Sequence, residues 1–179
     1  MVADSLKFPV HRVTNTIMPW PENTTLITGS SIISGLQEKK LLKYNAKIRS
    51  FPGACIDDMY DYILPLLKKK PTNIILHIGS NDSLHKNAEQ ILNEIRNLNT
   101  FIENILPTVK IFVSCPVIRM DNEKANSTLR KLNQLLLSCS NTIINENVDK
   151  SCLGKKGLHL NPKGSGRLAI NYIALMRCL

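Results

Sequence analysis

The sequence predicts a three-layer α/β/α sandwich around a mostly parallel, five-stranded sheet. Five short runs of β-branched and apolar residues alternate along the chain with five longer segments whose apolar residues recur at helical spacing. This alternation predicts parallel strands joined by right-handed helical crossovers. The length of 179 residues and the hydrophobic content of 43% suit one domain with a sizeable core.

In the first half of the chain, the run Thr24–Thr28 is β-branched and apolar and stops at a glycine, as a strand does. The segment Ser31–Lys40 has its apolar residues on one side and a serine at its start, which predicts a capped helix. Lys47–Phe51 is the second predicted strand. Apolar residues from Met59 onward then mark a helix that ends at Lys70 before a proline.

The second half continues the alternation. The run Ile74–Ile78 is nearly all apolar, as in a strand covered on both faces, and predicts the central strand. The same criteria predict helices over Ala88–Ile105, Leu129–Leu136 and Leu168–Leu175, and strands over Ile111–Val113 and Thr142–Ile144. We expect one domain over residues 24–179, after a polar, proline-containing lead over residues 1–23.

Composition narrows the class of protein. The first residues include an acid and lack the apolar stretch of a secretion signal, so we expect a cytoplasmic, reducing location. Five widely spaced cysteines without a CxxC pair favour free thiols and imply no metal site. The formal net charge of +9 favours weak electrostatic contact with nucleic acid or an anionic membrane. Aromatic residues, at 5%, supply few surfaces for stacking bases.

Functional residues are expected directly after the strands, because ligands bind beyond the carboxyl ends of a parallel sheet. Four residues there have the chemistry of acyl transfer: Ser31 as nucleophile, His159 as base, and the Gly53 backbone and Asn81 side chain as hydrogen-bond donors. Singly, each is more often a helix cap, a turn residue or a loop residue. Their occurrence together at one predicted sheet edge favours a site.

Two further polar residues are interpreted as structural. His77 lies inside the apolar central strand, which is typical of a core histidine. Asp82 follows Asn81 in the turn after that strand, where we expect it to brace the turn.

The four residues resemble, in order and position, the sequence blocks of the SGNH (GDSL-type) hydrolases, over most of residues 24–179. The blocks are Gly29-Ser30-Ser31, Pro52-Gly53-Ala54, Gly79-Ser80-Asn81-Asp82 and Gly157-Leu158-His159-Leu160-Asn161, of which the third is the most specific. The resemblance implies a flavodoxin-like fold, a lipid or acetyl ester as substrate, and no cofactor. It also implies Ser31 and His159 as catalytic residues, with Ser31, Gly53 and Asn81 forming the oxyanion hole.

Two positions depart from the family pattern. Ser30 stands at the usual aspartate of the first block, and Lys156 stands where the family has the aspartate that orients the histidine. Without that acid, we expect a main-chain carbonyl within residues 155–157 to accept the Nδ1 proton of His159. Asp149 is the less favoured substitute.

Two stretches, Asp58–Asp82 and Cys152–Arg167, resemble more narrowly the esterase-type domains in first open reading frame proteins of some animal non-LTR retrotransposons. That resemblance implies one domain of a longer protein. A hypothesis of another class stays open: the charge of +9, Lys156 and Ser30 also suit a weakly active or inactive domain that binds nucleic acid, lipid or protein.

Overall fold

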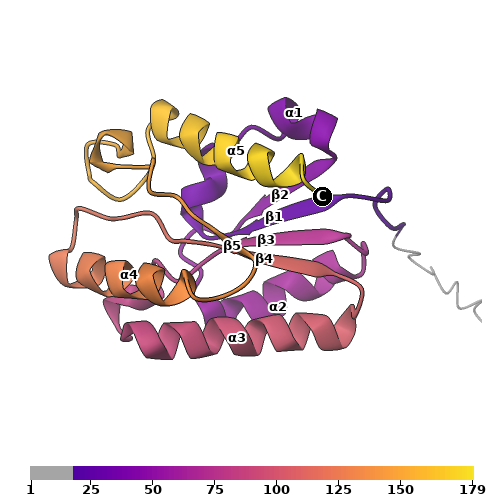
Figure 1. The fold of residues 1–179 in the computed structure, drawn as a ribbon, viewed down its shortest axis with the longest axis horizontal. Helices are drawn as coiled ribbons and strands as arrows, with labels where there is room; N and C mark the ends of the chain where they lie inside the picture. Colours follow the sequence, from indigo (N-terminus) through magenta and orange to yellow (C-terminus); the bar gives the residue numbers. More distant parts are fainter. Residues whose placement is uncertain (1–17) are drawn as a thin grey trace, which may run out of the picture.

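The computed structural model describes residues 18–179, which fold around a five-stranded sheet (Figure 1). The strands are β1 (Thr25–Gly29), β2 (Ala46–Ser50), β3 (Asn73–His77), β4 (Lys110–Ser114) and β5 (Thr142–Ile143). Their order across the sheet is β2-β1-β3-β4-β5, and every neighbouring pair is parallel. This is the flavodoxin-like order, so the predicted fold class is confirmed.

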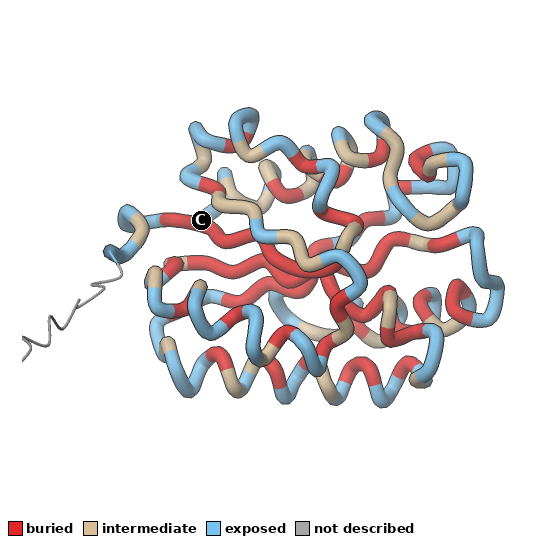
Figure 2. The backbone as a smooth tube through the Cα atoms, turned by 180° about the vertical axis from the view of Figure 1, so that it is seen from behind, coloured by how far each residue is buried: buried red, intermediate tan, exposed pale blue. Residues whose placement is uncertain are grey.

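Helices cover both faces of the sheet and complete the three layers (Figure 1). One face carries α2 (Ile56–Leu67), α3 (Ala88–Ile105) and α4 (Glu123–Leu136). The other carries the 3₁₀ helix η1 (Ser31–Gly35), α1 (Glu38–Leu41) and α5 (Pro162–Met176). Short 3₁₀ turns are η2 (Leu42–Tyr44), η3 (Asp82–Leu84) and η4 (Lys150–Cys152). In Figure 2 the buried backbone follows the strands and the inward sides of the helices.

The sheet has a separate hydrophobic core on each face, because successive strand residues point to opposite sides. Leu26 and Ile74 pack with α2, α3 and α4, whereas Ile27 and Ile75 pack with η1, α1 and α5. Strand β3 is buried along its whole length. Its continuous apolar run therefore reflects a central position covered on both faces, as predicted.

Two helices begin earlier than their apolar spacing predicts. The observed starts are Glu123 for α4 and Pro162 for α5, against expected starts at Leu129 and Leu168. Capping side chains mark the true starts of both: Asn122 and Asn161 each accept a backbone N–H from three residues further on. Apolar spacing shows where a helix is buried, whereas the cap shows where it begins.

The helix predicted over Ser31–Lys40 is wrong in its length. The segment forms η1, becomes extended at Leu36 and Gln37, and then forms α1, which has only four residues. Gly35, at the break, lies so close to Ser165 of α5 that a Cβ at position 35 would be 2.5 Å from the serine Oγ. Any larger residue at position 35 would therefore displace the Ser165 hydroxyl, and glycine also weakens helix continuation at this position.

The described part of the predicted lead, residues 18–23, is attached to the end of α2. The Trp20 N–H donates to the Lys69 carbonyl at 2.7 Å, and Lys69 Nζ donates to the Met18 carbonyl at 3.1 Å. Residues 1–17 of that lead lie outside the described residues. Within residues 18–179, no helix combines the length and the apolar content needed to cross a membrane.

Candidate active site

The first three strands end at the same level, which brings the segments that follow them to one edge of the sheet. Gly29 of β1 is in register with Ser50 of β2 and His77 of β3. The strand order reverses between β1 and β3, and such a switch point is where open α/β sheets form a ligand crevice. Ser31 follows the strand on one side of this point, and Asn81 follows the strand on the other.

Ser31 and His159 are in hydrogen-bond contact although they lie 128 positions apart in the sequence. The Oγ of Ser31 lies 3.1 Å from Nε2 of His159. Ser31 is half-buried and His159 is exposed, so the pair is accessible from solvent. A nucleophilic hydroxyl and its general base need this separation.

The neighbouring Ser30 has a different environment. Its side chain is buried and its Oγ has no hydrogen-bond partner in the described part of the chain. Its backbone N–H donates to the carbonyl of His77 at 3.2 Å. Of the two adjacent serines, Ser31 is the one that meets both solvent and a base.

Gly53 and Asn81 place hydrogen-bond donors at the same edge. Gly53 has a φ of 82°, which favours glycine, and a Cβ there would meet no atom within 4 Å, so the space beside it is open. No hydrogen bond within residues 18–179 uses the N–H of Gly53 or of Ser31. Asn81 Nδ2 donates to the Ala54 carbonyl at 2.8 Å, which orients the amide and leaves its second N–H for a ligand.

Asp82 braces the loop after β3, as predicted. Its buried Oδ1 accepts the N–H of Ile56 at 3.1 Å. Lys86 Nζ lies 3.5 Å from the same oxygen and also pairs with Asp57 and Glu94. Burial raises the pKa of Asp82, although the Ile56 N–H and the Lys86 charge act in the opposite direction. These contacts tie the Asn81 loop to α2 and α3.

Arg119, in the segment between β4 and α4, holds the loop from its other side. Its NH1 donates to the Ser80 carbonyl at 3.0 Å, and its Nε and NH2 donate to the two oxygens of Asp121 at 2.8 and 2.5 Å. The Arg119 side chain is 5% exposed, so its charge depends on this acid for compensation. The guanidinium holds the pKa of Asp121 below its usual range.

The orienting contact expected for His159 does not form. Among the described residues, no hydrogen bond joins its Nδ1 to a carbonyl within residues 155–157. The Gly157 carbonyl accepts the Met120 N–H instead, at 2.7 Å. Lys156, at the position of the family's aspartate, is exposed. The expected bond is therefore not found, and one of the three candidate carbonyls, that of Gly157, holds the segment that follows β4 instead.

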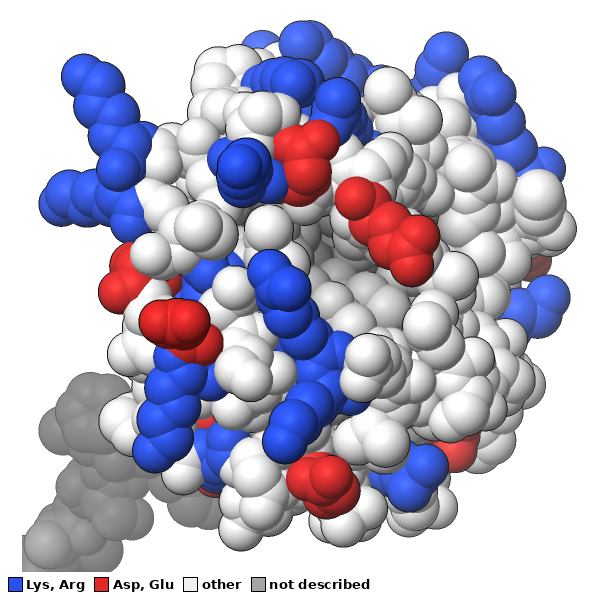
Figure 3. All heavy atoms as spheres, turned by 60° about the vertical axis from the view of Figure 1, so that its left-hand side comes forward, with Lys and Arg blue, Asp and Glu red and all other residues white. Residues whose placement is uncertain are grey.

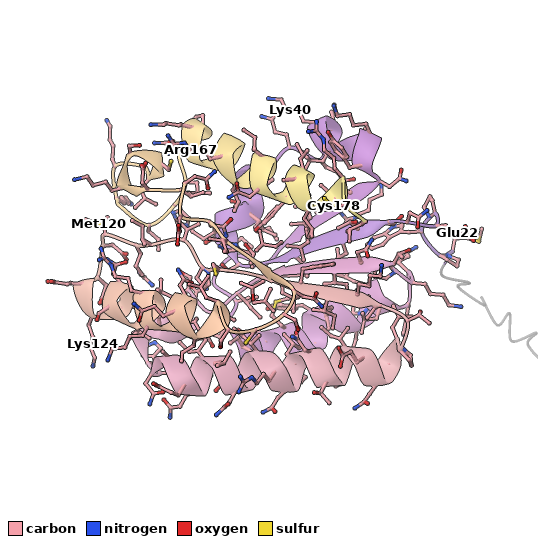
Figure 4. The ribbon with its side chains drawn as sticks, viewed as in Figure 1. Glu22, Lys40, Met120, Lys124, Arg167 and Cys178 are labelled. Atoms are coloured by element: carbon pink, nitrogen blue, oxygen red, sulfur yellow. The ribbon has the colours of Figure 1, made fainter. Side chains whose placement is uncertain are left out.

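Both carboxylate oxygens of Asp149, the less favoured candidate for orienting His159, are occupied by contacts with neighbouring residues. Its Oδ1 accepts the Ser151 N–H at 2.8 Å and so caps η4, while its Oδ2 pairs with Arg167 at 2.8 Å. The Ser151 and Arg167 contacts hold the pKa of Asp149 far below its usual range. Figure 4 places Arg167 in the first turns of α5, beside the loop that precedes this helix.

The surface on this side of the molecule has mixed charge. Figure 3, which brings the carboxyl ends of the strands forward, shows a hollow near the middle of the face with Asp and Glu beside it. Lys and Arg side chains are dispersed over the face and separated by acidic and uncharged residues. The charge of +9 is therefore not gathered into one continuous basic patch on this face.

No protein-family model and no curated protein matches the chain, but solved structures match it in fold. A GDSL-like lipase from Bacteroides thetaiotaomicron superimposes with a TM-score of 0.77 at 12% identity, over 89% of this chain and 92% of the lipase. The chain has the fold of a GDSL-type hydrolase. A lipase/acylhydrolase from Enterococcus faecalis gives a TM-score of 0.67 at 15% identity, over 86% of this chain and 95% of that one.

An acetylxylan esterase from Geobacillus stearothermophilus also shares the GDSL-type fold, with a TM-score of 0.67 at 13% identity, over 90% of this chain and 96% of the esterase. The identities are low, so these likenesses establish the fold. They support the resemblance that the four sequence blocks indicate. The roles of the individual site residues stay predictions.

The GDSL-type fold brings together the residues that the sequence singles out and adds two that it does not. Ser31 contacts His159, and Gly53 and Asn81 follow the strands on either side of β1. Sequence reasoning missed Arg119 and Asp121. The available signal was an Arg-x-Asp pair in the segment after a predicted strand, where a sheet of this kind places its ligands.

Proposed function

We propose that this protein is a serine esterase that hydrolyses carboxylic esters. The observation that carries the proposal is the 3.1 Å contact between Ser31 Oγ and His159 Nε2, accessible to solvent and located at the carboxyl edge of a GDSL-type sheet. The N–H groups of Ser31 and Gly53, which no hydrogen bond within the described residues uses, and the second N–H of Asn81 support the proposal as donors to an oxyanion.

In the proposed reaction, His159 Nε2 takes the hydroxyl proton as Ser31 Oγ attacks the ester carbonyl carbon. The tetrahedral oxyanion collapses, the bond to the alcohol oxygen breaks, and the imidazolium protonates the leaving alcohol. Water then attacks the acyl-serine and gives its proton to His159, and the carboxylic acid leaves as Ser31 regains its proton. Lipid and acetyl esters are the proposed substrate class.

Two assays test this function on the same preparation. Turnover of a short-chain chromogenic ester measures hydrolysis, and a fluorophosphonate measures covalent labelling of the serine. We expect both in the wild-type protein and neither in Ser31→Ala, with Ser114→Ala as a control that removes a buried serine hydroxyl. An unlabelled, inactive wild-type protein with an intact fold would contradict the esterase proposal.

The proposal extends to context. The resemblance to retrotransposon esterase domains implies one domain of a longer protein, and a further open reading frame of the same element downstream of its gene is the expected finding. A gene without such a neighbour or its remnants would contradict this part. Five unpaired cysteines support a reducing, cytoplasmic location.

A second candidate function is a binding module for nucleic acid or anionic membrane, supported by the charge of +9. Dispersed basic residues neutralise phosphates without reading bases, so binding should be independent of sequence and should disappear as salt rises. Titration of a fluorescent single-stranded RNA between low and high ionic strength checks this. Affinity that does not change with salt would contradict an electrostatic contact.

A further inference from the structure

The segment between β4 and α4 lies against the loop that carries His159. Besides the bond from the Met120 N–H to the Gly157 carbonyl, the two backbones are in direct contact. Gly157 has a φ of 66°, and a Cβ there would lie 2.7 Å from Met120 Cβ and 3.3 Å from the backbone nitrogen of Asp121. Figure 4 shows Met120 at this end of the molecule, between the start of α4 and the loop before α5. Asp121 is thus adjacent to a residue two positions before His159.

The carboxylate of Asp121 is held in place from the opposite side. Arg119 grips both of its oxygens and also donates to the Ser80 carbonyl, next to Asn81. Because the guanidinium is almost fully buried and planar, this two-oxygen contact fixes the carboxylate in position and orientation. The hydrogen bonds from Arg119 hold the pKa of Asp121 below its usual range, so the acid is ionised at neutral pH. Its backbone lies against Gly157, in the loop that carries the imidazole.

We propose that Asp121, held by Arg119, is the positioning acid of this site and replaces the aspartate that is absent at Lys156. The inference rests on the proposed esterase function. The negative charge of Asp121 stabilises the imidazolium that forms when Ser31 loses its proton. Arg119 then connects the acid with the proposed oxyanion hole, because its guanidinium donates both to Asp121 and to the Ser80 carbonyl in the loop of Asn81.

Two of the segments that meet near His159 carry charged residues. Asp121 and Arg119 lie on the segment after β4, and Lys155 and Lys156 lie on the loop of His159 itself. The η1 segment, which supplies Ser31, has no charged residue. Asp121 is therefore the negative charge that these segments bring to the imidazole, and its removal should favour the neutral ring.

The test is the pH dependence of fluorophosphonate labelling in Asp121→Asn, with Asp149→Asn as the matched control. Both changes remove one acid paired with an arginine near the same sheet edge. In Asp121→Asn we expect the labelling rate at the plateau of the pH profile to fall about 10- to 100-fold. This is less than the loss of about 10⁴ in kcat when a triad acid is replaced, because the Asp121 carboxylate is also paired with Arg119. The acidic limb of the profile should move to lower pH by about 0.5 to 1 unit. Asp149→Asn should change neither, and Asp121→Glu should restore part of the rate.

Three other results would contradict the proposal. If the labelling rate and the acidic limb of the pH profile are both unchanged in Asp121→Asn, the role of Asp121 is overturned and the esterase proposal is unaffected. A lower rate with an unmoved limb indicates a merely structural residue and also overturns it. If Asp121→Asn does not fold, the double variant Arg119→Met with Asp121→Asn removes both charges and must show the same direction of shift. A wild-type protein that takes no label rejects the esterase proposal itself.

Discussion

Two serine–histidine pairs lie at the carboxyl ends of the strands, and only one of them is open to solvent. The Ser31–His159 pair has a separation of 3.1 Å at the surface. The Ser114–His77 pair has a separation of 2.9 Å, and both of its residues are 0% exposed. Short contact between a hydroxyl and an imidazole is therefore common to both, and it does not by itself make a catalytic pair.

The surroundings of the buried pair explain its different character. Ser114 Oγ also accepts from Tyr172 at 3.0 Å and from Asn145 at 2.8 Å, so its lone pairs are used within the core. Burial lowers the pKa of His77 to about 4, which keeps the ring neutral at physiological pH. This cluster joins β3, β4 and α5 and stabilises the fold, whereas the exposed pair has room for a substrate. The comparison leads to four predictions.

The largest expected difference between the pairs is in catalysis. Ser31→Ala should lower kcat for a chromogenic ester by a factor on the order of 10⁴ or more and leave the melting temperature unchanged. Ser114→Ala should keep kcat but lose about 1 to 3 kcal/mol of unfolding free energy, because it leaves buried polar partners unpaired. Kinetics and urea unfolding on both variants check this. Loss of activity in Ser114→Ala with native stability would reverse the assignment of the two pairs.

Two asparagines sharpen the same contrast. Asn81→Ala should lower kcat on the order of 10² to 10³ with little change in KM, the scale for losing one oxyanion donor. Asn145→Ala removes the buried bonds to Ser114 and the Cys115 carbonyl, so it should act on stability instead. Steady-state kinetics separate the two parameters. An Asn81→Ala variant with a raised KM and normal kcat would mean that the amide binds ground-state substrate.

His77 gives the buried cluster a pH signature. Its pKa in the folded state is about 4, below the ordinary value of 6.5, so the unfolded chain takes up a proton that the folded protein does not. Stability should therefore fall as pH decreases from about 6.5 to about 4, by about 3 kcal/mol in total from this group. Urea unfolding at a series of pH values measures the slope. His77→Gln should flatten it, while His85→Gln, at an exposed position, is the matched control; an unchanged slope in His77→Gln would contradict the assignment.

The smallest effect is expected at Ser30. Its buried Oγ has no hydrogen-bond partner among the described residues, so Ser30→Ala removes a hydroxyl that is not used. Much of the esterase activity should remain, and the melting temperature should stay the same or rise slightly. Inactivation by Ser30→Ala together with full turnover in Ser31→Ala would show that the nucleophile has been assigned to the wrong serine.

The sequence by itself determined the elements of the fold and most of the proposed machinery. Strand composition and helical spacing are local properties, so the five strands, the central position of β3 and the residues that follow each strand were predictable. Asn81 and Asp82 belonged to the most specific block, and the role of Asp82 as a brace is confirmed. Even the starts of α4 and α5 were present locally, as capping asparagines that apolar spacing alone does not reveal.

Only the tertiary structure decided which polar groups meet. The contact between Ser31 and His159, the grip of Arg119 on Asp121, and the burial of His77 depend on strand register and on how loops from distant segments pack. The close packing of Gly35, just before the break after η1, has the same origin, because its neighbour Ser165 lies on α5. Residue spacing along the chain expresses local preferences. Solvent access to a side chain, the pairing of charges and close packing arise from residues far apart in sequence. These properties distinguish the exposed Ser31–His159 pair from the buried Ser114–His77 pair.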